Sequence, residues 1–336
     1  MSLELVSRFI NLQSLDLRLS GTYLGSQFLQ DLGKLDNLLD MTLDTSPSIG
    51  APTFLTKGSD LKPPSTTSTF IQLRKLHILG TPSSISRVLD DMHVLMNLNT
   101  LLIHETTDDS WPDAESSWKR CFAIISTFPA IEDIQITQLE RPLWHHHNQY
   151  ALSISCFYPL YKLNNVTSFV IKNSTLSGLD EDFRFLACAF PKLKKFVEPC
   201  AEYREGRTLA SLYHFSQANR HLRELKISLA FDISDNLEAI NQIGRSIIQD
   251  HQHPLESLHI ASNFGSLNVP DMIQVAQFLD LIFPNLSTLK AYDTDTREVS
   301  SWTQIQQIRV ALQASRIRAS SAIKISNEHG EDGILP

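Results

Sequence analysis

Apolar residues recur along the chain in one short pattern, apolar-x-x-apolar-x-apolar. The phrase LQSLDL at 12–17 returns as LRKLHI at 73–78 and as LESLHI at 255–260. Ten copies fit the pattern, their first residues stand 25 to 35 positions apart by subtraction, and their first and fourth positions are all apolar. Such spacing is typical of an internal structural repeat. The first positions are Leu12, Leu38, Leu73, Leu98, Ile131, Val166, Leu193, Leu222, Leu255 and Leu286.

The pattern predicts which parts of each repeat are strand and which are helix. The end of each copy alternates apolar and polar residues, which predicts a short strand with one buried face. Between copies the period becomes helical, with apolar stripes through 235–252 and 271–283. Phe-Pro pairs at 128–129, 190–191 and 283–284 mark helix ends, because proline cannot continue a helix. Alternating strands and helices at this spacing predict parallel strands joined by right-handed crossovers.

A stack of such units is expected to curve. Helices are about 10 Å wide and strands lie about 4.8 Å apart, so the strands belong on the inner arc. The sequence predicts an α/β solenoid, a horseshoe with parallel strands on the concave face and helices on the convex face. About ten irregular repeats form a single array over 1–320, and 321–336 is a tail.

Two interruptions and one end element complete this prediction. Residues 46–69, rich in Pro, Ser and Thr, are expected to form a flexible insertion. Residues 106–117 form a second insertion, either a packed loop or a docking element. A helix over 300–319, with Trp302 and Val310 on its apolar side, is expected to cover the end of the stack.

The Leu-x-x-Leu-x-Leu phrase resembles the leucine-rich repeat, and its irregular spacing with true helices is similar to the ribonuclease-inhibitor-like class. The Phe-Pro-x-Leu phrases resemble, more narrowly, the repeat region of fungal F-box-type proteins. The resemblance covers about residues 5–320. The chain departs from the pattern at the family's ladder position, three residues beyond the sixth template position, where Asn or Cys is usual. Here only Asn263 is asparagine, and six copies carry Ser or Thr, whose hydroxyls could still bond the backbone.

This resemblance implies a protein-interaction scaffold, the substrate-recognition repeat region of an F-box-like ubiquitin-ligase receptor in the cytoplasm or nucleus. No F-box precedes the first copy, so a ligase adaptor would bind only through an F-box encoded upstream. Two alternatives stay open. One is a stand-alone regulatory leucine-rich-repeat protein without a ligase link, and the other is an α/β enzyme with an undetected site.

Charge and hydropathy disfavour two classes of partner. The formal net charge is −8, from 29 basic and 37 acidic residues, whereas a general nucleic-acid binder is expected to be basic. No apolar run approaches the ~18 residues that cross a bilayer. We therefore expect neither a nucleic-acid nor a membrane partner, and we expect no secretory signal.

The sequence contains few features that point to catalysis or metal binding. The histidine run at 145–147 has no cysteine or carboxylate cluster to complete a tetrahedral metal site. Phosphate-binding, nucleophile-elbow and zinc-protease motifs do not occur. Four widely spaced cysteines (Cys121, Cys156, Cys188, Cys200) fit small core residues in a reducing compartment. The sequence predicts no enzyme, no cofactor and no metal.

The predicted partner site follows from the strands, because their polar template positions face the inner arc. Read along the chain, these positions pass from acidic through apolar to basic, with Lys195, Lys226 and Lys290 as basic contacts. An apolar centre with charged flanks suits a specific protein interface. The central positions are Asp16, Thr42, His77, Leu102, Gln135, Val170, Val197, Lys226, His259 and Lys290.

Overall fold

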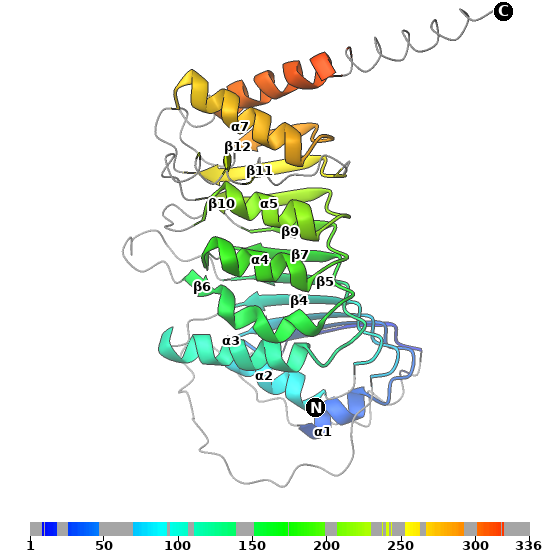
Figure 1. The fold of residues 1–336 in the computed structure, drawn as a ribbon. Helices are drawn as coiled ribbons and strands as arrows, with labels where there is room; N and C mark the ends of the chain where they lie inside the picture. Colours follow the sequence, from blue (N-terminus) through cyan, green and yellow to red (C-terminus); the bar gives the residue numbers. More distant parts are fainter. Residues whose placement is uncertain are drawn as a thin grey trace, which may run out of the picture. The chain divides into compact units, whose positions relative to one another are not determined.

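The chain forms two compact units, Met1–Pro199 and Cys200–Pro336. Most of their elements are labelled in Figure 1. The structure is a computed structural model. It describes residues 9, 11–18, 26–46, 70–92, 95–106, 111–138, 151–173, 175–198, 207–229, 237, 240, 241, 243, 253–262, 267–291, 301–316 and 318.

Parallel strands in chain order form the main sheet of the first unit. Their register sets equivalent template positions side by side, as when Leu76 faces Leu101 and Leu101 faces Ile134. Alternating burial in the strands at 40–44, 75–80, 100–105, 133–137 and 195–197 confirms the predicted period of two there, whereas the strand at 168–172 buries three successive residues. The strands are β1 (Ser14–Arg18), β2 (Asp40–Asp44), β3 (Lys75–Gly80), β4 (Thr100–Glu105), β5 (Asp133–Thr137), β7 (Ser168–Lys172) and β9 (Lys195–Val197).

The helices of the first unit alternate with these strands, and α2, α3 and α4 lie together on one face of the sheet (Figure 1). Local sequence explains where α2 starts: the Thr81 hydroxyl accepts the Ser84 N–H at 3.1 Å, and Pro82 follows the cap. The helices are α1 (Ser26–Leu32), α2 (Pro82–Asp91), α3 (Trp111–Ile125) and α4 (Asp180–Ala189), with the 3₁₀ helix η2 (Ile154–Lys162).

The second unit repeats the arrangement with parallel strands β10 (Glu224–Leu229), β11 (Ser257–Ser262) and β12 (Thr288–Ala291). Its helices include α5 (Leu209–Ala218) and α7 (Val269–Ile282). The predicted apolar stripe over 271–283 is confirmed, since Met272, Val275 and Leu279 are buried. The stripe over 235–252 lies mostly outside the described residues. The α/β class with parallel strands thus holds in both units, and the horseshoe curvature stays a prediction.

Buried aromatic side chains fill the middle of the first unit between helices and sheet. Trp118 stacks on Phe122 at 5.2 Å, and Phe122 contacts Phe157 at 4.8 Å between ring centroids. Phe157 meets Phe169 of β7 edge to face at 5.4 Å. Each large side chain removed from water contributes roughly 1.5–3 kcal/mol. This chain of rings therefore ties α3, η2 and β7 into one core.

The prediction of a second insertion over 106–117 is wrong from residue 111 onward, because α3 begins at Trp111. A proline in the first turn of a helix costs no hydrogen bond, since the first N–H groups have no intrahelical acceptor. The Trp111-Pro112 pair is therefore a helix start. The 46–69 insertion lies outside the described residues apart from Ser46, and the 321–336 tail and the histidine run at 145–147 lie outside them entirely.

Sequence analysis missed a small second sheet in the first unit, in which β6 (Ala151–Ser153) pairs in parallel with β8 (Thr175–Ser177). Each strand has three residues, which is too few to show a period of two. Asn173, directly after β7, has a positive φ of 57°, which suits an asparagine.

Eight of the ten repeats enter their strand through the same backbone turn, and in the ninth repeat the Leu255 N–H donates to the His253 ring instead. The N–H of the template's first residue donates to the carbonyl three residues earlier, as from Leu193 to Phe190 at 3.0 Å and from Leu286 to Phe283 at 3.1 Å. In eight of the repeats, one carbonyl also accepts two N–H groups of the next repeat. The Leu39 carbonyl, for example, accepts from Arg74 at 2.8 Å and from Lys75 at 3.0 Å. These bonds fix the spacing between neighbouring repeats.

An asparagine ladder reinforces these turns, and sequence analysis missed it. Asn97, Asn165 and Asn285 each stand just before the template's first residue. Their side-chain amides donate to the previous repeat, namely to the carbonyls of Ile71 at 2.6 Å, Pro129 at 3.1 Å and His253 at 3.2 Å. The family's ladder position lies at the other end of the strand, where Asn263 falls outside the described residues.

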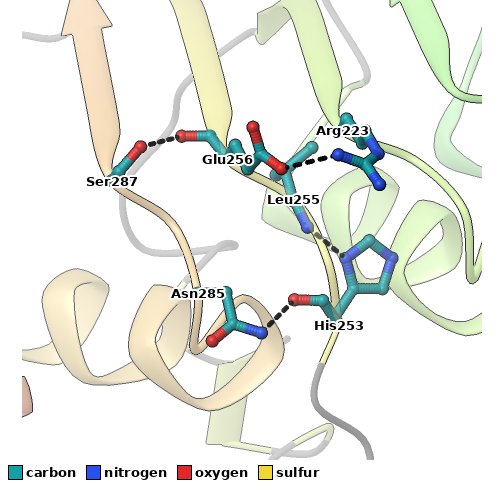
Figure 2. A network of polar contacts seen from close by, with 6 residues as sticks. All are labelled: Arg223, His253, Leu255, Glu256, Asn285 and Ser287. Carbon is teal, nitrogen blue, oxygen red and sulfur yellow. Dashed lines mark hydrogen bonds and ion pairs between the residues drawn. The ribbon is translucent and has the colours of Figure 1, made fainter.

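The same edge of the second unit holds a wider polar network (Figure 2). Arg223 and Glu256 form an ion pair at 3.0 Å, and the Ser287 hydroxyl donates to the Glu256 carbonyl at 2.8 Å. The side-chain amide of Asn285, in the next repeat, donates a hydrogen bond to the carbonyl of buried His253. Side chains of three successive repeats are thereby linked along one edge.

Hydroxyls at the far strand ends of the first unit bond one another. Ser46 donates to the Thr106 hydroxyl at 2.7 Å, and the hydroxyls of Thr45 and Ser84 lie 3.1 Å apart. Gly80 leaves room for the Thr45–Ser84 contact, since a Cβ at position 80 would lie 2.3 Å from the Thr45 hydroxyl. The φ of Gly80 is +158°, which also favours glycine. In the described copies, the Ser and Thr residues at the family's ladder position, three residues beyond the template, therefore form hydrogen bonds.

The predicted C-terminal helix spans 301–316 and packs on its own unit. Gln306 donates to the Ser287 carbonyl at 3.0 Å, and Gln313 donates to the Pro284 carbonyl at 2.7 Å. Placing Val310 on its apolar side was wrong, because Val310 is 49% exposed and Arg309 is buried instead. The buried side runs through Trp302 and Ile305 to position 309, and the Arg309 guanidinium bonds Gln306 at 3.0 Å.

Candidate functional site

The face of each sheet opposite the helices carries the residues predicted to bind a partner, and we call it the open face. Its central row lies in register from strand to strand, so the predicted contacts are neighbours within each unit. In the first unit the row is Asp16, Thr42, His77, Leu102, Gln135, Val170 and Val197. In the second unit it is Lys226, His259 and Lys290.

Exposure along this row agrees with a binding surface, with one correction. Thr42, His77, Leu102 and Gln135 are half-buried, and Asp16 is exposed. Val170, predicted as an open apolar contact, is only 7% exposed. Its short side chain stands between Gln135 and Val197 on the adjacent strands, about 4.8 Å away on each side, and they leave it little room.

The first strands of the open face carry acidic groups. Asp16 and Asp40 are exposed, and Arg18 pairs with Asp16 at 3.7 Å. Because exposed ion pairs are weak, this pair still leaves both groups accessible to a partner. Burial, followed by the charges of His104 and Lys75, lowers the pKa of His77, while Asp16 opposes that shift. His77 is therefore neutral at pH 7.

The middle of the first unit's open face is apolar. Leu102 of β4 and Val197 of β9 are half-buried, and Gln135 lies between them in the row on β5. Side chains held on a rigid strand can accept an apolar partner residue at small entropic cost. This stretch can desolvate a contact but carries no group for proton transfer.

The second unit ends in a basic row. Lys226, His259 and Lys290 occupy adjacent strands in strict register. The imidazole of His259 is held by the hydroxyl of Ser257, with Nε2 and Oγ 3.0 Å apart. Lys195, predicted as a further basic contact, lies in β9 of the other unit. It is the third residue of its template copy, whereas Lys226 is the fifth residue of its own copy and belongs to the central row.

Two of the described cysteines, Cys121 and Cys156, offer no reactive thiol. Burial raises the pKa of Cys121 and of Cys156 to about 12, so both thiols stay protonated near neutral pH. Cys188 was predicted as a core residue and is exposed, since α4 buries Phe183, Leu186 and Ala187 instead. No group of three or more metal-binding side chains occurs in the described part of the chain.

None of the helices in the described ranges is both long enough and apolar enough to cross a bilayer.

Comparisons with known proteins leave the family open. No family model matches the sequence. No curated protein matches it either. Among solved structures, the chain is similar to a chain in the crystal structure of the Rad7 and Elc1 complex in yeast, at 13% identity and a TM-score of 0.38, over 88% of this chain and 75% of that one.

A second solved structure is more distant. It is a sugar phosphate isomerase/epimerase from Parabacteroides distasonis, at 10% identity and a TM-score of 0.19, over 90% of this chain and 96% of that one. Both superpositions are too loose to carry an argument about function. The function proposed below therefore rests on the residues of the open face.

Proposed function

We propose that this chain is a leucine-rich-repeat scaffold that binds a partner protein on its open face and catalyses no reaction. The observation that carries the proposal is the register of the central row, in which the predicted contacts of each unit lie on adjacent strands. A continuous row of half-buried side chains suits an extended contact with another protein.

The backbone supports such a role because it is already ordered. The paired carbonyl bonds and the asparagine ladder hold neighbouring strands in place before any partner arrives. A preordered surface loses less entropy on binding than a mobile one. Affinity would then come from apolar contacts near Leu102 and orientation from the charged positions.

A finer form of the proposal is that the chain is the substrate-recognition repeat region of an F-box-type ubiquitin-ligase receptor in the cytoplasm or nucleus. The Phe-Pro-x-Leu phrases support it, and the free thiols of Cys121 and Cys156 suit a reducing compartment. Affinity purification of the full-length gene product tests it. Recovery of a ligase adaptor in stoichiometric amount supports the link, and its absence favours a stand-alone regulatory protein.

The binding role itself can be tested with a photo-cross-linking amino acid at position 102, compared with position 185. Phe185 is a large exposed side chain on α4, away from the sheet. The captured partner is identified, purified and titrated against two variants. We expect Leu102→Glu to weaken binding at least about tenfold, since a charge enters an apolar contact, while Phe185→Glu changes it less than about twofold. The reverse order of effects would place the partner on the helical side.

A further inference from the structure

The basic row of the second unit points to the chemistry of the segment that binds there. We propose that Lys226, His259 and Lys290 bind an extended acidic peptide segment with carboxylates at alternate positions. This inference rests on the proposed scaffold function and names the kind of partner surface that this part of the open face accepts.

The spacing of the row fits such a segment. Lys226 pairs with His259 and His259 pairs with Lys290, so the two lysines stand two strands apart. Strands lie about 4.8 Å apart, which puts the lysine Cα atoms roughly 10 Å from each other. Alternate residues of an extended peptide are about 6.7 Å apart. The flexible lysine stems can close the difference, so each carboxylate would lie between one lysine and the histidine.

The charges that face His259 favour an anion. Lys226 and Lys290 flank it on both sides, Ser257 bonds its ring, and Glu224 is the acidic group close enough to oppose them among the described residues. Burial and then the two lysines lower the pKa of His259, which shows that a positive potential acts on the ring. A bound carboxylate reduces the mutual repulsion of these groups, whereas a basic or neutral segment does not.

A short acidic peptide fits better than a nucleic acid, although both are anionic. The whole chain carries a formal net charge of −8, so a long polyanion is repelled by most of the molecule. A segment with two or three carboxylates interacts mainly with the local row. Screening at about 10 Å in 0.1 M salt confines the attraction to this region.

The test uses the full chain and a fluorescein-labelled peptide, Glu-Gly-Glu-Gly-Glu, followed by anisotropy in low salt. The variant Lys226→Gln/Lys290→Gln removes both lysines of the row. The matched control, Lys192→Gln/Lys194→Gln, removes two lysines exposed in the turn before β9. We expect about tenfold weaker binding for the row variant and less than about twofold change for the control. Circular-dichroism melts confirm that each variant is folded.

Three results would overturn the inference. One is equal loss of binding in both double variants, and another is unchanged binding in the row variant. The third is tighter binding of a twelve-residue oligothymidylate than of the peptide. Among peptides with two glutamates, Glu-Glu-Gly-Gly-Gly should bind more weakly than Glu-Gly-Glu-Gly-Gly, since neighbouring side chains of an extended chain point to opposite sides and alternate ones to the same side.

Failure of this inference is distinct from failure of the scaffold function. If the peptide does not bind but Leu102→Glu still weakens the purified partner, only the acidic-segment assignment falls. If the peptide binds to the row while the partner is insensitive to Leu102→Glu, the assignment stands and the open face of the first unit loses its proposed role.

Discussion

His253 shows how one buried side chain can set the response of the protein to acid. Its Nδ1 accepts the Leu255 N–H at 3.2 Å, so Nε2 must carry the proton and donate to the Asn219 carbonyl at 3.0 Å (Figure 2 shows the first of these bonds). The ring also packs edge to face on Phe283 at 5.0 Å. Both ring nitrogens are therefore satisfied only in the neutral form.

We expect acid to destabilise the second unit through this residue. Burial lowers the His253 pKa from 6.5 to about 4, although the Asn219 bond opposes the shift. A depressed folded pKa means that the unfolded chain binds the proton first, so stability falls as pH drops from about 6.5 towards 4. The loss is about 3 kcal/mol for this shift. Urea midpoints across this pH range measure it.

The control for this experiment is His253→Asn, whose side-chain oxygen can still accept the Leu255 N–H but does not titrate. It should be less stable at pH 7 and should show a shallower fall towards pH 4. Parallel pH curves for the two proteins would contradict the assignment.

At the scale of an element, each strand separates a buried face from an open face. Leu225 and Ile227 of β10 are buried, while Glu224 and Lys226, which alternate with them, are half-buried. Because side chains alternate across a strand, adjacent residues have opposite roles. The sequence predicted this division in all ten strands, since the leucine-centred phrases carry the period of two.

We expect Leu225→Asp to abolish folding of β10 and its neighbours, and Lys226→Glu to leave them folded. A buried unpaired carboxylate costs about 4 kcal/mol or more, whereas a charge change on the open face costs less than about 1 kcal/mol. Circular-dichroism melts of the two variants check this. Greater damage from Lys226→Glu would show that the register of the strand is different.

For the whole molecule, the division into two compact units suggests that damage stays local. Each repeat of a linear array contacts mainly its neighbours, so stability is close to a sum of local contributions. The single array over 1–320 remains a prediction from the sequence, and each unit holds its own parallel strands and helices.

Hydrogen exchange can measure this locality. In Leu225→Asp, we expect amide protection to fall by at least about tenfold in β10, β11 and β12, while β3, β4 and β5 keep their protection. Uniform loss across both sets of strands would instead show one cooperative unit. Lys226→Glu serves as the reference with protection unchanged in both.

The sequence by itself determined the strands of the main sheet, their parallel order and their open face, because a period of two and a repeat length are properties of neighbouring residues. Tertiary structure alone decided which polar groups meet. The Asn285 ladder, the burial of Arg309 in place of Val310, and the near-closure of Val170 all depend on atoms from other repeats. These contacts join residues about thirty positions apart, so the local period does not name their partners, although the asparagine that recurs before the template marks where the ladder stands.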